Sequence, residues 1–124
     1  MKSPGREPGF DTLLDLDGQV FVIDPDGAYW VKFVVHRVDP SPERPHGLDY
    51  SLTLHDAGGR RLAGFDNAHP IRKASRGTRG RELARDHKHR LHAVRPYDFT
   101  DAATLLADFW TEVDNVLRER GILE

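Results

Sequence analysis

The stretch Leu48–Asp56, LDYSLTLHD, decides the fold. Apolar and polar residues alternate along it, which is the period of a strand with one buried and one solvated face. The next four residues, AGGR at 57–60, favour a hairpin turn, and Arg61–Asp66 return as the second strand. In a regular strand, Ala63 and Phe65 would lie on one side, and Leu62, Gly64 and Asp66 on the other.

Further strands are predicted on the N-terminal side of this hairpin. Residues 29–38, YWVKFVVHRV, are rich in β-branched and aromatic side chains and predict a long strand. Residues 20–23, VFVI, pair with it across the turn signal at 24–27, DPDG. Leu13, Leu14 and Leu16 predict a short first strand. Three prolines make residues 39–47 a loop.

On the C-terminal side, a long basic loop at 70–85 leads to a last short strand at Asp86–Leu91. Thr100 or Asp101 then caps a helix, and Gly121 suits its C-terminal end. The apolar residues of this helix recur at helical spacing as one continuous stripe. They are Ala102, Leu105, Leu106, Phe109, Trp110, Val113, Val116 and Leu117.

These elements predict an α+β domain, an antiparallel sheet of four to five strands with the long C-terminal amphipathic helix packed on one face. Residues 10–124 form this single domain, and residues 1–9 read as a disordered lead-in. Trp30, Val34 and Val38 share a side of their strand. If a second copy covers that side, the protein is a homodimer.

Composition excludes several classes of protein. The 124 residues include no cysteine, so disulfides and thiolate zinc sites are excluded. No segment approaches the roughly 20 apolar residues of a membrane span, so no membrane association is expected. The N-terminus has no apolar core of a secretory signal. The expected location is the cytoplasm.

The net charge of −2 hides a strong asymmetry. Residues 60–95 hold eleven Lys and Arg against three acids, so this segment is strongly basic and the rest of the chain is acidic. A basic loop of this kind favours a phosphate-bearing partner such as RNA, although it could also pack on the acidic body of its own molecule. The candidate nucleic-acid contacts are Arg72, Lys73, Arg76, Arg79, Arg81 and Arg85.

Histidines and aspartates flank this loop. Asp66 ends one predicted strand and His69 follows it, whereas His87 and His89 belong to the next strand. Residues two apart in a strand point the same way, so the two rings share a face, and Asp86, Lys88 and Arg90 share the other. If the strands are neighbours, Asp66, His69, His87 and His89 lie in one patch.

Three interpretations of this patch remain open. Histidines could act as base and acid in RNA cleavage, with Lys88 or Arg90 stabilising phosphate charge. Two histidines with Asp66 or His69 could instead bind a divalent metal, although no cofactor is required by the first interpretation. In the third, the histidines only make local hydrogen bonds, and Asp66 and Asn67 cap a turn.

The order of several short motifs over residues 29–120 resembles the TumE-like toxins of bacterial toxin–antitoxin systems. The similar pattern is a hydrophobic strand, a Gly-Arg turn, an aromatic-Asp-Asn, an Asp-His-x-His, a Tyr-x-Phe, and a helix that opens Leu-Leu-x-Asp-Phe. In this chain the motifs are YSL at 50–52, GRR at 59–61, FDN at 65–67, DHKH at 86–89, YDF at 97–99 and LLADF at 105–109. One departure is the long, Arg-rich connection from Asn67 to Arg85.

This resemblance implies a small growth-inhibiting toxin that acts on RNA and has a helix-turn-helix antitoxin as its partner. It implies a site made of Asp66, Asn67, Asp86, His87 and His89. We expect the two histidines to be the acid and base, one aspartate to orient them, and Asn67 and His69 to help position substrate. The alternative is a non-catalytic module that binds nucleic acid or protein through the Arg-rich loop.

Overall fold

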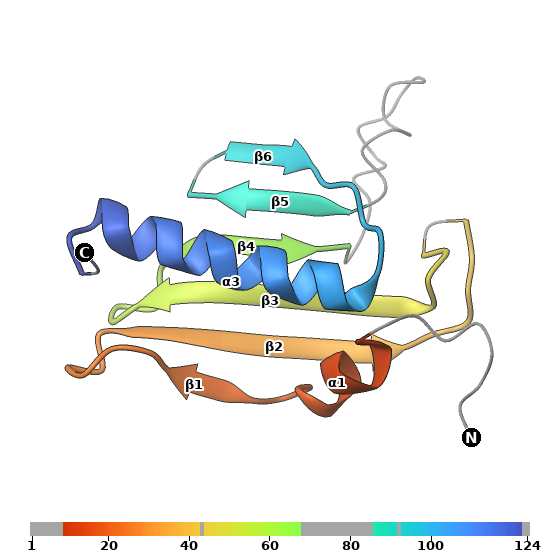
Figure 1. The fold of residues 1–124 in the computed structure, drawn as a ribbon, viewed down its shortest axis with the longest axis horizontal. Coiled ribbons are helices and arrows are strands. Elements are labelled where there is room, and N and C mark those ends of the chain that lie inside the picture. The colour runs from red at the N-terminus through yellow and green to blue at the C-terminus, as the bar shows by residue number, and fades with distance from the viewer. Residues whose placement is uncertain (1–8, 43, 68–85, 92, 123–124) are drawn as a thin grey trace.

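The computed structural model describes residues 9–42, 44–67, 86–91 and 93–122. One antiparallel sheet of six strands follows the chain order β1-β2-β3-β4-β5-β6 (Figure 1). The strands are β1 (Val20–Val22), β2 (Tyr29–Arg37), β3 (Leu48–Asp56), β4 (Arg61–Asp66), β5 (His87–Arg90) and β6 (Ala93–Pro96). The helices are α1 (Phe10–Asp15) and α3 (Ala102–Glu119). The α+β prediction is confirmed, with more strands than the four to five expected.

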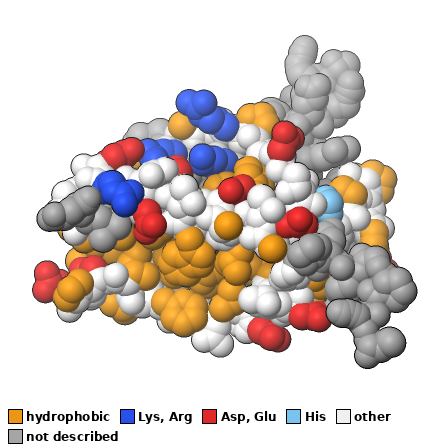
Figure 2. Space-filling model, viewed as in Figure 1, with side chains coloured by type: hydrophobic (Ala, Val, Ile, Leu, Met, Phe, Trp, Pro, Cys, Tyr) orange, Lys and Arg blue, Asp and Glu red, His pale blue; other side chains and the backbone are white. Residues whose placement is uncertain are grey.

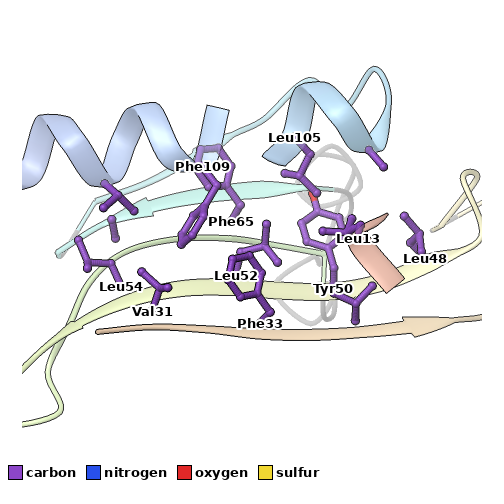
Figure 3. Close-up of a cluster of buried hydrophobic side chains, with 14 of the residues drawn as sticks. Leu13, Val31, Phe33, Leu48, Tyr50, Leu52, Leu54, Phe65, Leu105 and Phe109 are labelled. Carbon is purple, nitrogen blue, oxygen red and sulfur yellow. The ribbon is translucent and has the colours of Figure 1, made fainter. Parts of the chain in front are cut away.

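The core lies between the sheet and α3 (Figure 3). The even-numbered apolar residues of β3 face the helix and are almost completely buried, as the alternation predicts. Phe33 of β2 and Phe65 of β4 lie on the same side, and both rings pack edge-on against Phe109 of α3. Burial of such aromatic rings is the largest single source of stability in a core of this size.

A β-bulge interrupts the pairing of β3 with β4. Leu54 pairs with Ala63, but the neighbouring His55 pairs with Arg61, so Leu62 is an extra residue on β4. Leu62 and Ala63 are therefore both buried in the core. The expected strict alternation of β4 is wrong at this point. Alternation would place Arg61 on the same side as Ala63 and Phe65, but the bulge places it on the opposite side.

Helix α3 agrees with the sequence in its bounds and in most of its buried stripe, but Trp110 is 36% exposed and Glu112 is buried, so the prediction is wrong at these two positions. The side chain of Asp101 accepts a hydrogen bond from the backbone N–H of Thr104, 2.7 Å away, which is the predicted N-cap. Gly121 has a φ of 81°, a left-handed conformation that ends the helix at low steric cost. The amide of Ile122 donates back to the carbonyl of Leu117 over 2.8 Å.

The predicted first strand around Leu13–Leu16 is wrong, because these residues belong to helix α1 and its C-terminal turn. Phe10 and Leu13 are three residues apart and both are buried, which is the spacing of one helical face. Gly9 caps the helix at a φ of 79°, and a Cβ there would lie 2.5 Å from the backbone nitrogen of Ala103. This close approach lets α1 pack against the first turn of α3 (Figure 1).

The sixth strand arises because the expected last strand turns back. Arg90 of β5 pairs with Ala93 of β6 across a two-residue turn. Leu91 occupies the turn at a φ of 51°, a position where Gly or Asn would be the usual signal. The turn was therefore not recognisable from its residue types. Pro96 ends β6 at the sheet edge, where a missing N–H costs no sheet hydrogen bond.

Residues 1–8 of the predicted lead-in at 1–9 and the basic loop at 70–85 lie outside the described residues, whereas Gly9 is described and caps α1. Within the ranges that the structure does describe, neither helix is both long and apolar enough to cross a bilayer.

Candidate functional site

Strands β4 and β5 are neighbours, which brings the two halves of the predicted patch together. Asp66 pairs with His87, and Gly64 pairs with His89. The side chains of Asp66, His87 and His89 lie on the sheet face opposite α3, because the intervening Lys88 projects over Phe65 on the helix side. The predicted shared face of His87 and His89 is confirmed, and it is not the core face.

The Asp66 carboxylate lies between the two imidazole rings. Its Oδ2 atom is 2.8 Å from Nε2 of His89, a close contact without the alignment of a full hydrogen bond. Its Oδ1 atom is 3.8 Å from Nδ1 of His87. The ring centroids of the histidines are 6.3 Å apart. One carboxylate therefore contacts both rings and limits how each can turn.

The pKa of Asp66 reflects competing effects. Burial raises the pKa of this carboxyl, but the contacts with His89, His87 and Arg61 outweigh the burial and hold it below its usual value. Asp66 is therefore ionised at neutral pH.

Arg61 completes the cluster and was not predicted as a site residue. Its guanidinium Nη2 lies 3.2 Å from Nδ1 of His89. Since an arginine can only donate, Nδ1 carries the lone pair and Nε2 carries the proton that faces Asp66. Arg61 reaches this face because the bulge at Leu62 reverses its direction, and strict alternation along β4 concealed that reversal.

The members of the cluster differ in their access to solvent. His87 is buried, with 4% of its surface exposed. The side chains of His89 and Asp66 are 13% and 15% exposed, and Arg61 is fully on the surface. His89 is therefore the imidazole with better access to a ligand, and His87 lies behind it.

Asp86 belongs to a different site. Its Oδ2 atom accepts a hydrogen bond from the hydroxyl of Tyr50 on the helix side of the sheet. Burial raises the pKa of Asp86 above its usual value, although the bond from Tyr50 and the nearby His46 and His87 work against the rise. Asp86 also lines a pocket of about 250 Å³ with His46, Tyr97, Asp98 and Phe99.

The side chain of Asn67 hydrogen-bonds the backbone of β3. Its Oδ1 atom accepts from the amide of Tyr50 over 2.9 Å, and its Nδ2 atom donates to the carbonyl of Leu48 over 2.8 Å. The side chain is buried and holds the end of β4, from which Asp66 projects. In this arrangement both the oxygen and the nitrogen of the Asn67 side chain bond the backbone of β3, next to the residue that carries the Asp66 carboxylate.

Lys88 and Arg90 lie on the helix side of the sheet, away from the histidines. Nζ of Lys88 is 3.6 Å from Oε1 of Glu112, and Nε of Arg90 is 2.8 Å from Oε2 of the same residue. Arg90 also hydrogen-bonds Glu119. The structure does not bring these two cations to the Asp66–His89 pair, and the cation beside that pair is Arg61.

Other predicted site residues lie outside the described residues. They are His69, Arg72, Lys73, Arg76, Arg79, Arg81 and Arg85. In the part of the chain that is described, no three His, Asp or Glu side chains gather in a group that could hold a metal ion.

Comparison with known proteins places the chain in a family. Residues 16–117, most of the chain, match the family described as Toxin TumE. No curated protein and no solved structure matches the chain. The matched region includes every strand and almost all of α3, and it contains the whole Asp66–His87–His89 cluster with Arg61. The chain therefore belongs to the TumE family of toxins, whose members act within toxin–antitoxin systems.

Proposed function

We propose that this protein is a cytoplasmic toxin that cleaves RNA at the cluster of Asp66, His89 and Arg61. The observation that carries the proposal is the position of His89 between a carboxylate and a guanidinium. Asp66 lies 2.8 Å from one ring nitrogen, and Arg61 lies 3.2 Å from the other. A base oriented by a carboxylate, with a cation beside its lone pair, is an arrangement that suits phosphodiester chemistry.

In the proposed reaction, Nδ1 of His89 removes the proton from a ribose 2′-hydroxyl. The 2′-oxygen then attacks the adjacent phosphorus, the bond to the 5′-oxygen breaks, and a 2′,3′-cyclic phosphate forms. The ionised Asp66, 2.8 Å from Nε2 of His89, stabilises the positive charge of the imidazolium that results. The departing 5′-oxygen takes a proton from water.

Arg61 supplies the positive charge for the phosphate in this scheme. It is exposed, so it can exchange its contact with His89 for one with a phosphate oxygen, which frees the Nδ1 lone pair. Binding of substrate and activation of the base then occur together. The cations of residues 72–85 are proposed to hold the rest of the RNA backbone, a step that rests on their charge in the sequence.

His87 is proposed as a positioning residue. It is buried and lies 3.8 Å from the second oxygen of Asp66, so it acts on the reaction through that carboxylate. The proposal therefore differs from the predicted acid–base pair of His87 and His89, because it keeps only His89 in contact with the substrate, as the base.

The experiment uses purified protein and a fluorescently labelled single-stranded RNA. We expect wild type to produce fragments that end in cyclic phosphate, and His89→Ala to cleave about 10² to 10⁴ times more slowly. His36→Ala is the matched control, because His36 lies on the same sheet face but on β2, two strands away from β4, where it pairs with Asp49 and lies 3.9 Å from Asp17. Arg61→Ala should lower the rate of cleavage and should reduce how strongly that rate falls as the salt concentration rises.

Two outcomes would contradict the proposal. Cleavage by His89→Ala at the wild-type rate would remove His89 from the chemistry. Tight RNA binding by wild type without any cleavage would favour the alternative, a non-catalytic module that binds nucleic acid through its Arg-rich loop.

A further inference from the structure

The two edges of the sheet differ in chemistry. At the β6 edge, the pairs Arg90–Ala93 and Lys88–Arg95 bond inward, which turns the backbone groups of Val94 and Pro96 outward. Pro96 has no N–H to offer there, and Arg95 adds a charge to the strand. Proline and charge are the usual means by which a sheet edge avoids pairing with another chain.

The β1 edge has neither protection. The amide of Phe33 donates to Gln19, and the amide of Ile23 donates to Tyr29, so alternate residues of β1 bond inward. Val20 and Val22 therefore direct their N–H and C=O groups away from the sheet. Both are β-branched and more than half exposed, with 53% and 62% of their surfaces accessible. Among the residues that the structure describes, no further strand pairs with this edge, which is apolar and suited to strand addition.

An apolar surface continues from this edge onto the helix side. Phe21 pairs with the buried Val31, so its ring lies on the face that α3 covers. Phe21 is 40% exposed and Trp110 of α3 is 36% exposed, and each ring contacts Phe33 between them. Figure 2 shows hydrophobic side chains gathered over this region, with acidic side chains around its margin.

The segments on both sides of β1 are acidic, which favours a basic ligand at this edge. Residues 15–28 contain Asp15, Asp17, Asp24 and Asp26 but no Lys or Arg. The nearest cation on the next strand is Lys32, which pairs with Val20. If two copies paired antiparallel through β1 and were centred on Phe21, Asp24 and Asp26 of one copy would lie opposite the Asp15–Gly18 segment of the other. Like charges placed opposite each other destabilise such a pairing.

We propose that β1 is the docking edge for an extended segment of a partner protein that has alternating apolar residues flanked by Lys or Arg. The segment adds a seventh strand beside Val20 and Val22, its apolar side chains extend the surface of Phe21 and Trp110, and its basic flanks meet the four aspartates. Family membership implies an antitoxin as partner, and the antitoxin is therefore the candidate source of this segment. The surface is separate from the Asp66–His89–Arg61 cluster, which lies on the other face of the sheet and on distant strands.

The test begins with the full chain as bait for a displayed library of random nine-residue peptides. We expect the enriched peptides to share alternating apolar residues and basic ends. When the best peptide is added to isotope-labelled protein, the amides of Val20 and Val22 should become at least 10-fold more protected from hydrogen exchange. The amide of Val94, on the outward side of the other edge, should not change.

Val22→Pro removes one outward N–H without breaking the β1–β2 pairing, and we expect it to weaken peptide binding at least 10-fold. Val94→Pro makes the same change at the β6 edge and should leave binding unchanged. The exchange measurement on wild type stands independently if Val22→Pro fails to fold.

Three results would overturn the proposal. The first is enrichment of peptides with no apolar alternation or with acidic ends. The second is binding that protects Val94 and leaves Val20 and Val22 unaffected. The third is a wild-type dimer that Val22→Pro converts to monomer, which would make a second copy the occupant. None of these results bears on RNA cleavage, so the two proposals fail separately.

Discussion

At the residue scale, Asp66 and Asp86 lie on opposite sides of the sheet and depend on pH in opposite ways. The pKa of Asp66 in the folded protein is below its ordinary value of 3.8. Its ionised form therefore adds stability above that value, and the contribution is lost as the pH falls through the lowered pKa. We expect Asp66→Asn to unfold about 1 to 2 kcal/mol more easily at pH 7. Denaturant titrations should show this gap closing in acid, and a gap that widens would contradict the assignment.

Asp86 should behave in the opposite sense. Its pKa in the folded protein is raised, so its contribution to stability is complete below 3.8 and is lost as the pH rises through the raised value. Asp86→Asn keeps an acceptor for the hydroxyl of Tyr50 and removes a buried charge. We expect this variant to be as stable as wild type or up to about 1 kcal/mol more stable at pH 7. A clear loss of stability at pH 7 that disappears in acid would show that the charged form is favoured.

Asn67 offers a test of the backbone that supports the site. Asn67→Ala leaves the amide of Tyr50 and the carbonyl of Leu48 buried without their partners. We expect a loss of about 2 to 4 kcal/mol in the free energy of unfolding, measured by chemical denaturation. Asn115→Ala, the same change at an exposed position of α3, should stay within about 0.5 kcal/mol. Equal effects of the two changes would mean that Asn67 does not support β4.

The convergence of Asp66, His87 and His89 was predictable because it depends only on two strands being neighbours and on the two-residue period of each. Arg61 was not predictable, because a bulge changes the facing of every residue before it and leaves no signal in the residue types around Leu62. The opposite placement of Lys88 and Arg90 followed from the same period that placed the histidines.

At the element scale, β5 and α3 are joined by buried charge, and Glu112 is the central residue. Its side chain is 7% exposed and contacts both Arg90 and Lys88. Glu112→Ala leaves a partly buried Arg90 without its closest partner, and we expect a loss of about 2 to 3 kcal/mol. Glu119, the other partner of Arg90, has a side chain that is 62% exposed. Glu119→Ala should therefore lower the free energy of unfolding by less than about 0.5 kcal/mol. Thermal denaturation of the two variants checks this, and a larger effect at Glu119 would contradict it.

Elements with a long, clean period were predictable in type and bounds, whereas two of the short elements, α1 and β6, were not. The nine residues of β3 and the apolar stripe of α3 each carry several repeats of their pattern, so their bounds agree with the structure. Helix α1 has six residues, and its helical character rests on Phe10 and Leu13 packing against other elements. Strand β6 depends on a turn at Leu91 that tertiary pairing imposes against local preference.

At the scale of the whole molecule, the sheet separates three surfaces. The helix side holds the core and the buried charges of Glu112 (Figure 3). The opposite side holds the cluster of Asp66, His89 and Arg61. The β1 edge, where the partner segment is proposed to bind, is three strands away from β4 in the strand order. This separation allows a partner to bind without occupying the candidate active site, and any inhibition by a β1 ligand would then be indirect.

The central claim is that toxicity depends on the imidazole of His89. The most direct measurement is growth of bacteria after induced expression of wild type, His89→Ala and the control His36→Ala at matched levels of folded protein. We predict that wild type and His36→Ala arrest growth, and that cells expressing His89→Ala grow like uninduced cells. Growth arrest by His89→Ala equal to that of wild type would contradict the claim.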